Sequence, residues 1–294
     1  MQRKIYLSGL VFMAPITIII FVFLVYPILQ SMFYSLTDWT GVGGYRFIGL
    51  SNYTDIFKDE GFTDALKRTL FIGLTTAVLA NLFGLFFAVL LDQSLKTKNV
   101  LRALFYIPNV IPTVVAAFVW RYILDSNTGM LNKGLVALFG EKGSILWLDS
   151  PDYVVYTIIG ITVWAMWGPI LIIYLAALQG VPHEMKEAMM IDGATKRQSF
   201  VHLTLPMIAP GITVNVLIGL ANGLRIFDLP FALTGGGPAG ASETLSVKIY
   251  RYAFSSTELS YGLSASFILT VIALVVTFFF IALSRKYEKG TIGG

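Results

Sequence analysis

The sequence predicts an all-α membrane protein with six transmembrane helices. Of its 294 residues, 56% are hydrophobic and 13% are charged, and the mean hydropathy is +0.74, whereas a soluble domain carries about a quarter charged residues. Because about 20 apolar residues cross a bilayer as a helix, with every backbone group paired, long uncharged stretches mark spans. Six such stretches occur, and we expect one single transmembrane domain over 1–294 with helices at 5–37, 69–91, 103–120, 153–182, 203–224 and 259–284.

The first two stretches are uninterrupted. Residues 5–37 form too long an uncharged run for an ordinary signal peptide and contain no small-residue cleavage site after a short apolar core, so we expect a span that is retained. Residues 69–91 have about the length of one straight helix.

The next two stretches contain prolines, each of which removes a backbone hydrogen bond and can kink a helix. Pro108 and Pro112 lie in the third stretch, and Gly168-Pro169 lies in the fourth. The fourth also contains Trp164 and Trp167 near mid-span, where an interfacial aromatic belt would not place them. Indole faces suit the apolar faces of sugar rings, and ordinary packing explains the two residues equally well.

A loop with several helix start and stop signals, residues 179–206, connects the fourth and fifth stretches. Pro182 favours a helix start, Gly193 can end that helix in a left-handed conformation, and Thr195 to Gln198 has capping-box spacing for a second helix. Apolar residues are mixed among its charges, which is typical of a protein-binding surface. We expect two short helices at an angle, and a solvated hairpin is the alternative.

The fifth stretch carries polar residues on one helix face: Asn215, Gly219, Asn222 and Arg225. Polar groups inside a membrane face a bundle interior or a water-filled path, and asparagine can both donate and accept hydrogen bonds to sugar hydroxyls. Helix–helix packing is the alternative, since Asn and Gly commonly join spans. Arg225 and Asp228 are expected to form an ion pair near the outer end, and a role as solute ligands is the alternative.

Basic residues suggest the orientation. With six spans both termini lie on one side of the membrane. Lys and Arg are concentrated in the short segments of that side, whereas the first loop on the opposite side is rich in acids. We expect both termini to be cytoplasmic. The net charge of +4 then reflects topology, and no nucleic-acid partner is expected.

The loop at 179–206 resembles the "EAA" loop of ABC-importer permeases, the binding-protein-dependent inner-membrane components. The resemblance lies in Glu187-Ala188, Asp192-Gly193-Ala194 and Leu205-Pro206, and Met189 replaces the usual second alanine. It implies a cytoplasmic coupling loop in which Glu187 meets a basic residue of an ATPase and Gly193 supplies the bend.

Other segments are similar to the carbohydrate branch of that family, close to the six-span maltose- and glycerol-phosphate-type permeases, and together they cover nearly the whole chain. They are Tyr26-Pro27-Ile28, Ser35 to Trp39, Phe47 to Tyr53, Leu233 to Pro238, Glu243-Thr244-Leu245 and Ile249-Tyr250-Arg251.

The resemblance implies a type I importer permease fold and a subunit of an ATP-driven sugar importer in a bacterial inner membrane. The implied partners are a second permease in a heterodimer, two ATP-binding cassette subunits, an extracytoplasmic solute-binding protein, a sugar and membrane lipid. The residues themselves give the candidates for a substrate path described above, which are Asn222, Asn215, Gly219, Trp164 and Trp167.

The chain is not expected to be an enzyme or to bind a cofactor. It has no phosphate-loop motif, so ATP and Mg²⁺ are expected on a partner subunit. It has no cysteine, and His183 and His202 are too far apart to suggest a metal site. A gradient-driven secondary transporter of a small polar solute is the alternative, although the six stretches contain no carboxylate to couple to an ion.

Overall fold

The structure is a computed structural model that describes residues 12–93 and 96–292. Within these ranges the secondary structure is helical, apart from one isolated antiparallel bridge between Thr37 and Phe47. The contacts divide the chain into two compact units, one formed by residues up to 63 with 248–270 and the other by 64–247 with the residues from 271 onwards. The expectation of one transmembrane domain stays a prediction.

The first unit contains the amino-terminal spanning helix, Phe12–Tyr34. The Asn52 amide donates to the carbonyl oxygens of Ser35 and Thr37 at 2.9 and 2.8 Å, and Thr37 shares a 3.0 Å hydrogen bond with Ser260. These buried bonds fix the residues that follow the span. The helical segments of this unit are a π-helical turn (Phe21–Val25), α2 (Tyr26–Tyr34), α3 (Ser51–Ile56), a second π-helical turn (Arg251–Ser255) and the beginning of α15 (Leu259–Ile292).

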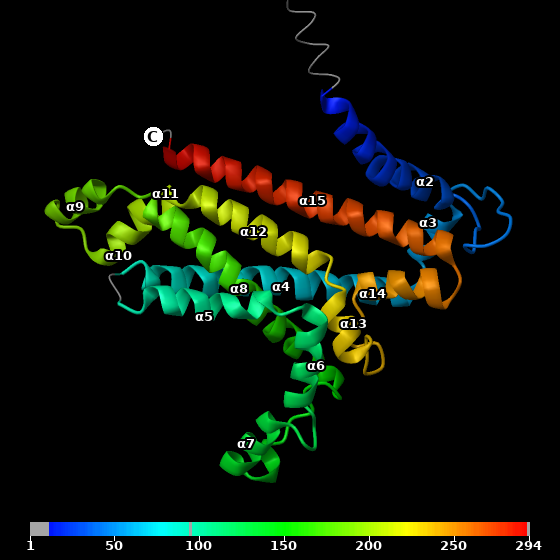
Figure 1. Ribbon diagram of the computed structural model, residues 1–294, viewed down its shortest axis with the longest axis horizontal. Coiled ribbons are helices and arrows are strands. Elements are labelled where there is room, and N and C mark those ends of the chain that lie inside the picture. Colours follow the sequence, from blue (N-terminus) through cyan, green and yellow to red (C-terminus); the bar gives the residue numbers. More distant parts are fainter. Residues whose placement is uncertain (1–11, 94–95, 293–294) are drawn as a thin grey trace, which may run out of the picture. The chain divides into compact units, whose positions relative to one another are not determined.

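The second unit contains most of the remaining helices (Figure 1). In chain order they are α4 (Glu60–Leu91), α5 (Lys98–Val110), α6 (Thr113–Ile123), α7 (Met130–Phe139), α8 (Pro151–Gln179), α9 (His183–Ile191), α10 (Lys196–Ser199), a π-helical turn (Phe200–Thr204), α11 (Leu205–Met207), α12 (Ala209–Leu224) and α13 (Asp228–Thr234). A short helix, α14 (Leu245–Tyr250), crosses the boundary between the units in the sequence.

Four helices are long and apolar enough to cross a membrane by themselves: Phe12–Tyr34, Glu60–Leu91, Pro151–Gln179 and Leu259–Lys286. Two further spans exist only if each of two bent helix pairs is counted as one. The span expected at 103–120, whose prolines were expected to allow a kink, and the span expected at 203–224 each contain a break. The fourth predicted span forms one helix that continues through Pro169.

The break in the third span lies between α5 and α6, which are bent by 96°. Pro112 disfavours a helical conformation at the preceding residue, and Ile111 and Pro112 are both extended, with ψ of 124° and 131°. Pro108 remains inside α5, so of the two prolines considered, Pro112 is the one at which the helix ends.

The break in the fifth span lies at Ile208, where α11 and the residues before it meet α12 at 67°. Pro206 and Pro210 both stand in first helical positions, where the missing N–H has no partner to lose. The prolines are thus compatible with a helix that stops and restarts, and the coupling loop is joined to α12 through this bend.

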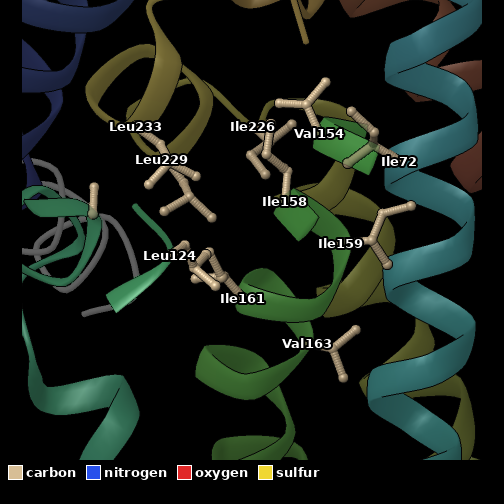
Figure 2. Close-up of a cluster of buried hydrophobic side chains, with 11 residues drawn as sticks. Ile72, Leu124, Val154, Ile158, Ile159, Ile161, Val163, Ile226, Leu229 and Leu233 are labelled. Carbon is tan, nitrogen blue, oxygen red and sulfur yellow. The ribbon is translucent and has the colours of Figure 1, made fainter. Parts of the chain in front are cut away.

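Buried apolar side chains form two clusters in the second unit. The first joins α4, α6, α8 and α13 through side chains such as Ile72, Ile158 and Leu233 (Figure 2). The second joins α4 and α8 around Ile170, Leu171 and Tyr174 and reaches Ile208 at the bend. Both clusters contain side chains of α8, so this helix is central to the core of the second unit.

Glycine allows α4 and α12 to cross closely. A Cβ built on Gly223 would lie 2.7 Å from the Gly73 Cα, and one built on Gly219 would lie 3.1 Å from the Ala77 Cβ. Small residues permit such an approach in membrane helices. The backbone of α12 is therefore set by its contact with α4.

Candidate functional site

A cavity of about 380 Å³ opens in the second unit beside the break between α5 and α6 and the junction of α12 with α13. Its wall comes from the end of α5, the start of α6, the middle of α8 and the junction of α12 with α13. The residues that line it include Asn109, Thr113, Thr162, Trp164, Ala165, Ala221, Asn222, Arg225 and Asp228. The break between α5 and α6 and the carboxyl end of α12 thus both border this space.

The lining of this cavity combines hydrogen-bonding groups with one indole. Asn109, Thr113 and Asn222 provide neutral donors and acceptors, and Thr162 already donates to the Ile158 carbonyl oxygen at 2.7 Å. Trp164 adds an apolar ring face and packs edge-on against Trp120, with 5.3 Å between ring centroids. Such a surface can hold a hydroxyl-rich solute with an apolar face.

The predicted ion pair between Arg225 and Asp228 is wrong. Both residues line the cavity and are exposed, and no salt bridge joins them in the part of the chain that the structure describes. Arg225 follows the end of α12 and Asp228 begins α13, so each charge is favourable to its own helix dipole. The two charges are therefore held at adjoining helix ends and remain available to the cavity.

Of the five path residues expected from the sequence, Asn222 and Trp164 line the cavity. Trp167 instead lies in an aromatic cluster with Phe87, Phe105 and Phe83, at centroid distances of 4.5, 5.0 and 6.3 Å. Its surroundings are those of a packing residue, and a substrate role for it stays a prediction.

Asn215 and Gly219 also lie in helix packing. Asn215 is completely buried and its amide donates to the Ile170 carbonyl oxygen at 3.1 Å, while Gly219 faces Ala77. The alternative that these residues join helices therefore describes their place in this structure, and a path role for either stays a prediction.

Sequence reasoning missed Asn109, Thr113 and Thr162 as cavity residues. The available signal was the pair Asn109 and Thr113 on either side of Pro112, since polar residues beside a helix-ending proline gain exposure to the gap. Thr162 carried no such signal, because a hydroxyl in a span usually bonds its own helix.

A second, polar cavity of about 260 Å³ is lined by Arg121, Asp125, Asp149 and the segment from Thr234 to Pro238. Asp125 accepts hydrogen bonds from the backbone and side chain of Thr128 and from the backbone of Asn127, and these bonds lower the pKa of its carboxyl. The carboxylate therefore stays ionised and holds the loop after α6.

The coupling loop has the local structure that the sequence predicts. Gly193 is left-handed with φ +83°, which ends α9, and Thr195 and Gln198 form a reciprocal capping box at α10. Pro182 is the residue before α9 and not part of its first turn. Two short helices separated by a glycine turn are thus confirmed.

The outer surface of α9 is exposed. The side chain of Ile191 is 85% exposed and that of Met190 54%, and Glu187 pairs with His183 at 3.1 Å while remaining accessible. The remaining motif residues vary in burial: Ala188, Asp192 and Gly193 are exposed, whereas Ala194, Leu205 and Pro206 are half-buried. The first half of the motif is thus accessible, and the second half is partly covered.

Lys186 reaches back from α9 to Asp92 after α4, with 3.9 Å between Nζ and Oδ2. Both side chains are 27% exposed. Beside this pair lies a largely apolar cavity of about 310 Å³ that also includes Lys196, Ser199 and Phe200.

Within the described residues, no group of three or more His, Cys, Asp or Glu side chains is placed to hold a metal ion.

Known proteins resemble the chain over nearly its full length. Residues 80–290 match the family model "Binding-protein-dependent transport system inner membrane component". The chain is 29% identical over 98% of its length to the probable starch degradation products transport system permease protein AmyD of Thermoanaerobacterium thermosulfurigenes, covering 98% of that protein. It is 32% identical over 91% of its length to the multiple sugar-binding transport system permease protein MsmF of Streptococcus mutans, covering 91% of it.

A solved structure shares the fold. A chain of a bacterial ABC transporter involved in the import of the acidic polysaccharide alginate superposes with a TM-score of 0.83 at 24% identity, covering 97% of this chain and 96% of that one. The type I importer permease fold is therefore confirmed. Members of the matched family are membrane components and not the ATP-hydrolysing enzymes, which are partner subunits. The chain belongs to the binding-protein-dependent transport system inner membrane components, the multi-pass permeases of ABC transporters.

Proposed function

We propose that this chain is a permease subunit of an ATP-driven, solute-binding-protein-dependent sugar importer. The observation that carries the proposal is the first cavity, of about 380 Å³, which lies at the break between α5 and α6 and at the junction of α12 with α13. It is lined by Asn222, Trp164, Arg225 and Asp228. Relatives named for starch degradation products, trehalose/maltose and multiple sugars support the solute class.

In this proposal the solute is held by hydrogen bonds from the neutral groups and by the ring face of Trp164. Hydroxyls both donate and accept, so Asp228 can accept from one hydroxyl while Arg225 donates to another. The cavity of one chain is part of a path completed by a second permease in a heterodimer. A solute-binding protein delivers the sugar from outside, and both termini are cytoplasmic.

The loop from α9 to α11 couples the path to two ATPase subunits, which hold ATP and Mg²⁺. Support comes from the exposed apolar surface of α9, which is typical of a protein contact, and from the bend at Ile208 that connects the loop to α12. Movement of the loop can thus reach Asn222 through one continuous helix, α12.

The test uses the complete transporter in proteoliposomes, with the sugar first identified by calorimetry on its binding protein. Glu187→Lys or Gly193→Trp is expected to abolish ATP-dependent uptake, while the chain still inserts and assembles. Glu184→Lys, also exposed on α9, serves as the control and is expected to retain uptake. Normal uptake by both coupling variants would refute the coupling role, and uptake by this chain alone under an ion gradient would favour a secondary transporter.

A further inference from the structure

The first helix of the coupling loop, α9, is held to the rest of the second unit with little burial. The structure describes every residue of α9, and none of them is buried. Lys186 and Met189 are half-buried and the other residues of the helix are exposed. Because residues three apart lie on one helix face, the covered face of α9 consists of one lysine and one methionine. Burial of apolar area therefore contributes little to the position of this helix.

Lys186 is the residue of this face that reaches another helix. Its Nζ lies 3.9 Å from Asp92 Oδ2, and both side chains are 27% exposed. The four other ion pairs among the described residues join positions at most eight residues apart. Within that part of the chain, Lys186 and Asp92 thus form the ion pair that joins segments distant in the sequence.

Asp92 lies at the end of a well-packed helix. Its backbone N–H donates to the Ala88 carbonyl oxygen at 2.9 Å, which continues the hydrogen bonding of α4 by one residue. Ala88 and Leu91 are 0% and 2% exposed and belong to the second apolar cluster. The carboxylate of Asp92 is therefore positioned by α4 and its core, and the long side chain of Lys186 is the flexible partner.

The space between α9 and the spans is incompletely filled. The cavity of about 310 Å³ beside the ion pair is bordered by Val89 of α4, Leu178 of α8 and Met190 of α9. Because apolar side chains do not close this gap, close packing does not fix the distance from α9 to α4. The ion pair, whose two residues also line the cavity, is the directional contact that joins the two helices there.

A displacement of α4 can reach the proposed sugar path directly. A Cβ built on Gly223 of α12 would lie 2.7 Å from the Gly73 Cα of α4, so the two backbones are nearly in contact. Such close contact transmits displacement, because there is no free space to absorb it. Asn222, which lines the first cavity, directly precedes Gly223.

We propose that Lys186 is a positioning residue for transport, which holds α9 against the end of α4 through Asp92. The coupling loop then has two connections to the path, one through the continuous chain into α12 and one through this ion pair into α4. A force applied to the loop by an ATPase subunit moves both helices. This inference rests on the proposed function, because it assumes that the loop receives that force.

The experiment is a double-mutant cycle in the complete transporter in proteoliposomes. Lys186→Gln and Asp92→Asn each remove one charge with little change of shape, and a double variant combines them. Lys186→Asp with Asp92→Lys exchanges the charges and keeps their attraction. Arg197→Gln, which removes the same charge from an exposed residue of the same loop, is the matched control.

The first measurement is the number of sugar molecules imported per ATP hydrolysed, with the sugar identified by calorimetry on the binding protein. Each single variant is expected to lower this ratio by about twofold or more. The double variant is expected to fall no further, because the second substitution removes an interaction that is already lost. The charge exchange is expected to restore the ratio, and Arg197→Gln to leave it unchanged.

The second measurement, hydrogen exchange of the His183–Ile191 amides in the same complexes, needs no sugar. Loss of a partly exposed ion pair is expected to speed this exchange by about two- to fivefold, and the charge exchange is expected to reverse the effect. This measurement keeps the test decisive should a variant transport too slowly for the first ratio to be determined.

Unchanged import ratios in both single variants, additive losses in the double variant, or a charge exchange that restores neither measurement would overturn the positioning role. In each of these cases the proposed function stands, as long as the unmodified transporter imports sugar when ATP is supplied. Absence of ATP-dependent import by the unmodified transporter contradicts the proposed function itself, and the inference is then overturned with it.

Discussion

Two tryptophans three residues apart on α8 have different surroundings. Trp164 faces the polar cavity, whereas Trp167 is enclosed by phenylalanines from α4 and α5. The difference arises because α8 turns by about 100° per residue, so positions three apart diverge by about 60°. A residue's contribution to transport or to stability is thus decided by its side of the helix.

We expect Trp164→Leu to reduce sugar uptake with near-normal protein levels, and Trp167→Leu to lower stability by about 0.5–3 kcal/mol, because it removes the ring contacts of a half-buried aromatic side chain. Uptake in proteoliposomes and thermal unfolding of the purified complex measure the two effects. Equal losses of stability in both variants would contradict the assignment.

Gly168 is a position where the addition of a single carbon atom, a Cβ, would cause a steric clash. A Cβ added there would lie 2.2 Å from the Phe105 carbonyl oxygen, which belongs to the backbone of α5 and cannot give way as a side chain would. Gly160, two turns earlier on α8, has no described atom within 4 Å of its added Cβ.

Gly168→Ala is therefore expected to destabilise the permease by about 1–3 kcal/mol or more through overpacking, and Gly160→Ala to be neutral or slightly stabilising as a helix substitution. Thermal unfolding of the two purified variants makes the comparison. Similar midpoints would show that α5 and α8 do not approach as closely as described.

At the scale of elements, the coupling loop depends on its caps more than on its length. The α10 residues are the first turn of a longer helical segment, Lys196–Met207, and a helix start needs a partner for its unpaired N–H groups. The capping box supplies it, since the Thr195 backbone N–H donates to Gln198 Oε1 at 2.8 Å and the Gln198 N–H donates to Thr195 Oγ1 at 3.3 Å.

Thr195→Ala is expected to weaken this helix start by about 1 kcal/mol, and Thr195→Ser to preserve it. Hydrogen exchange of the Lys196–Ser199 amides in the assembled transporter provides the measurement, with faster exchange expected in the alanine variant. Unchanged exchange in that variant would mean that packing alone holds α10.

At the scale of the whole molecule, the proposed topology places the coupling loop and the loop after α6 on opposite sides of the membrane. The basic segments of the sequence indicate that the coupling loop is cytoplasmic. The absence of native cysteine allows each side to be probed with a single introduced thiol.

In intact cells, an impermeant maleimide is expected to label Asn127→Cys and to leave His183→Cys unlabelled until the membrane is permeabilised. Both positions are exposed in this chain, so labelling that appears only after permeabilisation assigns a position to the cytoplasmic side. The reverse pattern would contradict the proposed orientation and the coupling role together.

Composition, long apolar runs and short-range rules were sufficient to predict the helical membrane class and the local structure of the coupling loop, including the left-handed Gly193 and the cap at Thr195. The family was predicted from motif residues that resemble it. Tertiary structure alone decided that Pro112 and Ile208, and not Pro169, interrupt helices. It also separated Asn222 in the cavity from Asn215 in the packing of α12 against α4 and α8. The reason is physical: these residues share one helix face, and what that face meets depends on neighbours distant in the sequence.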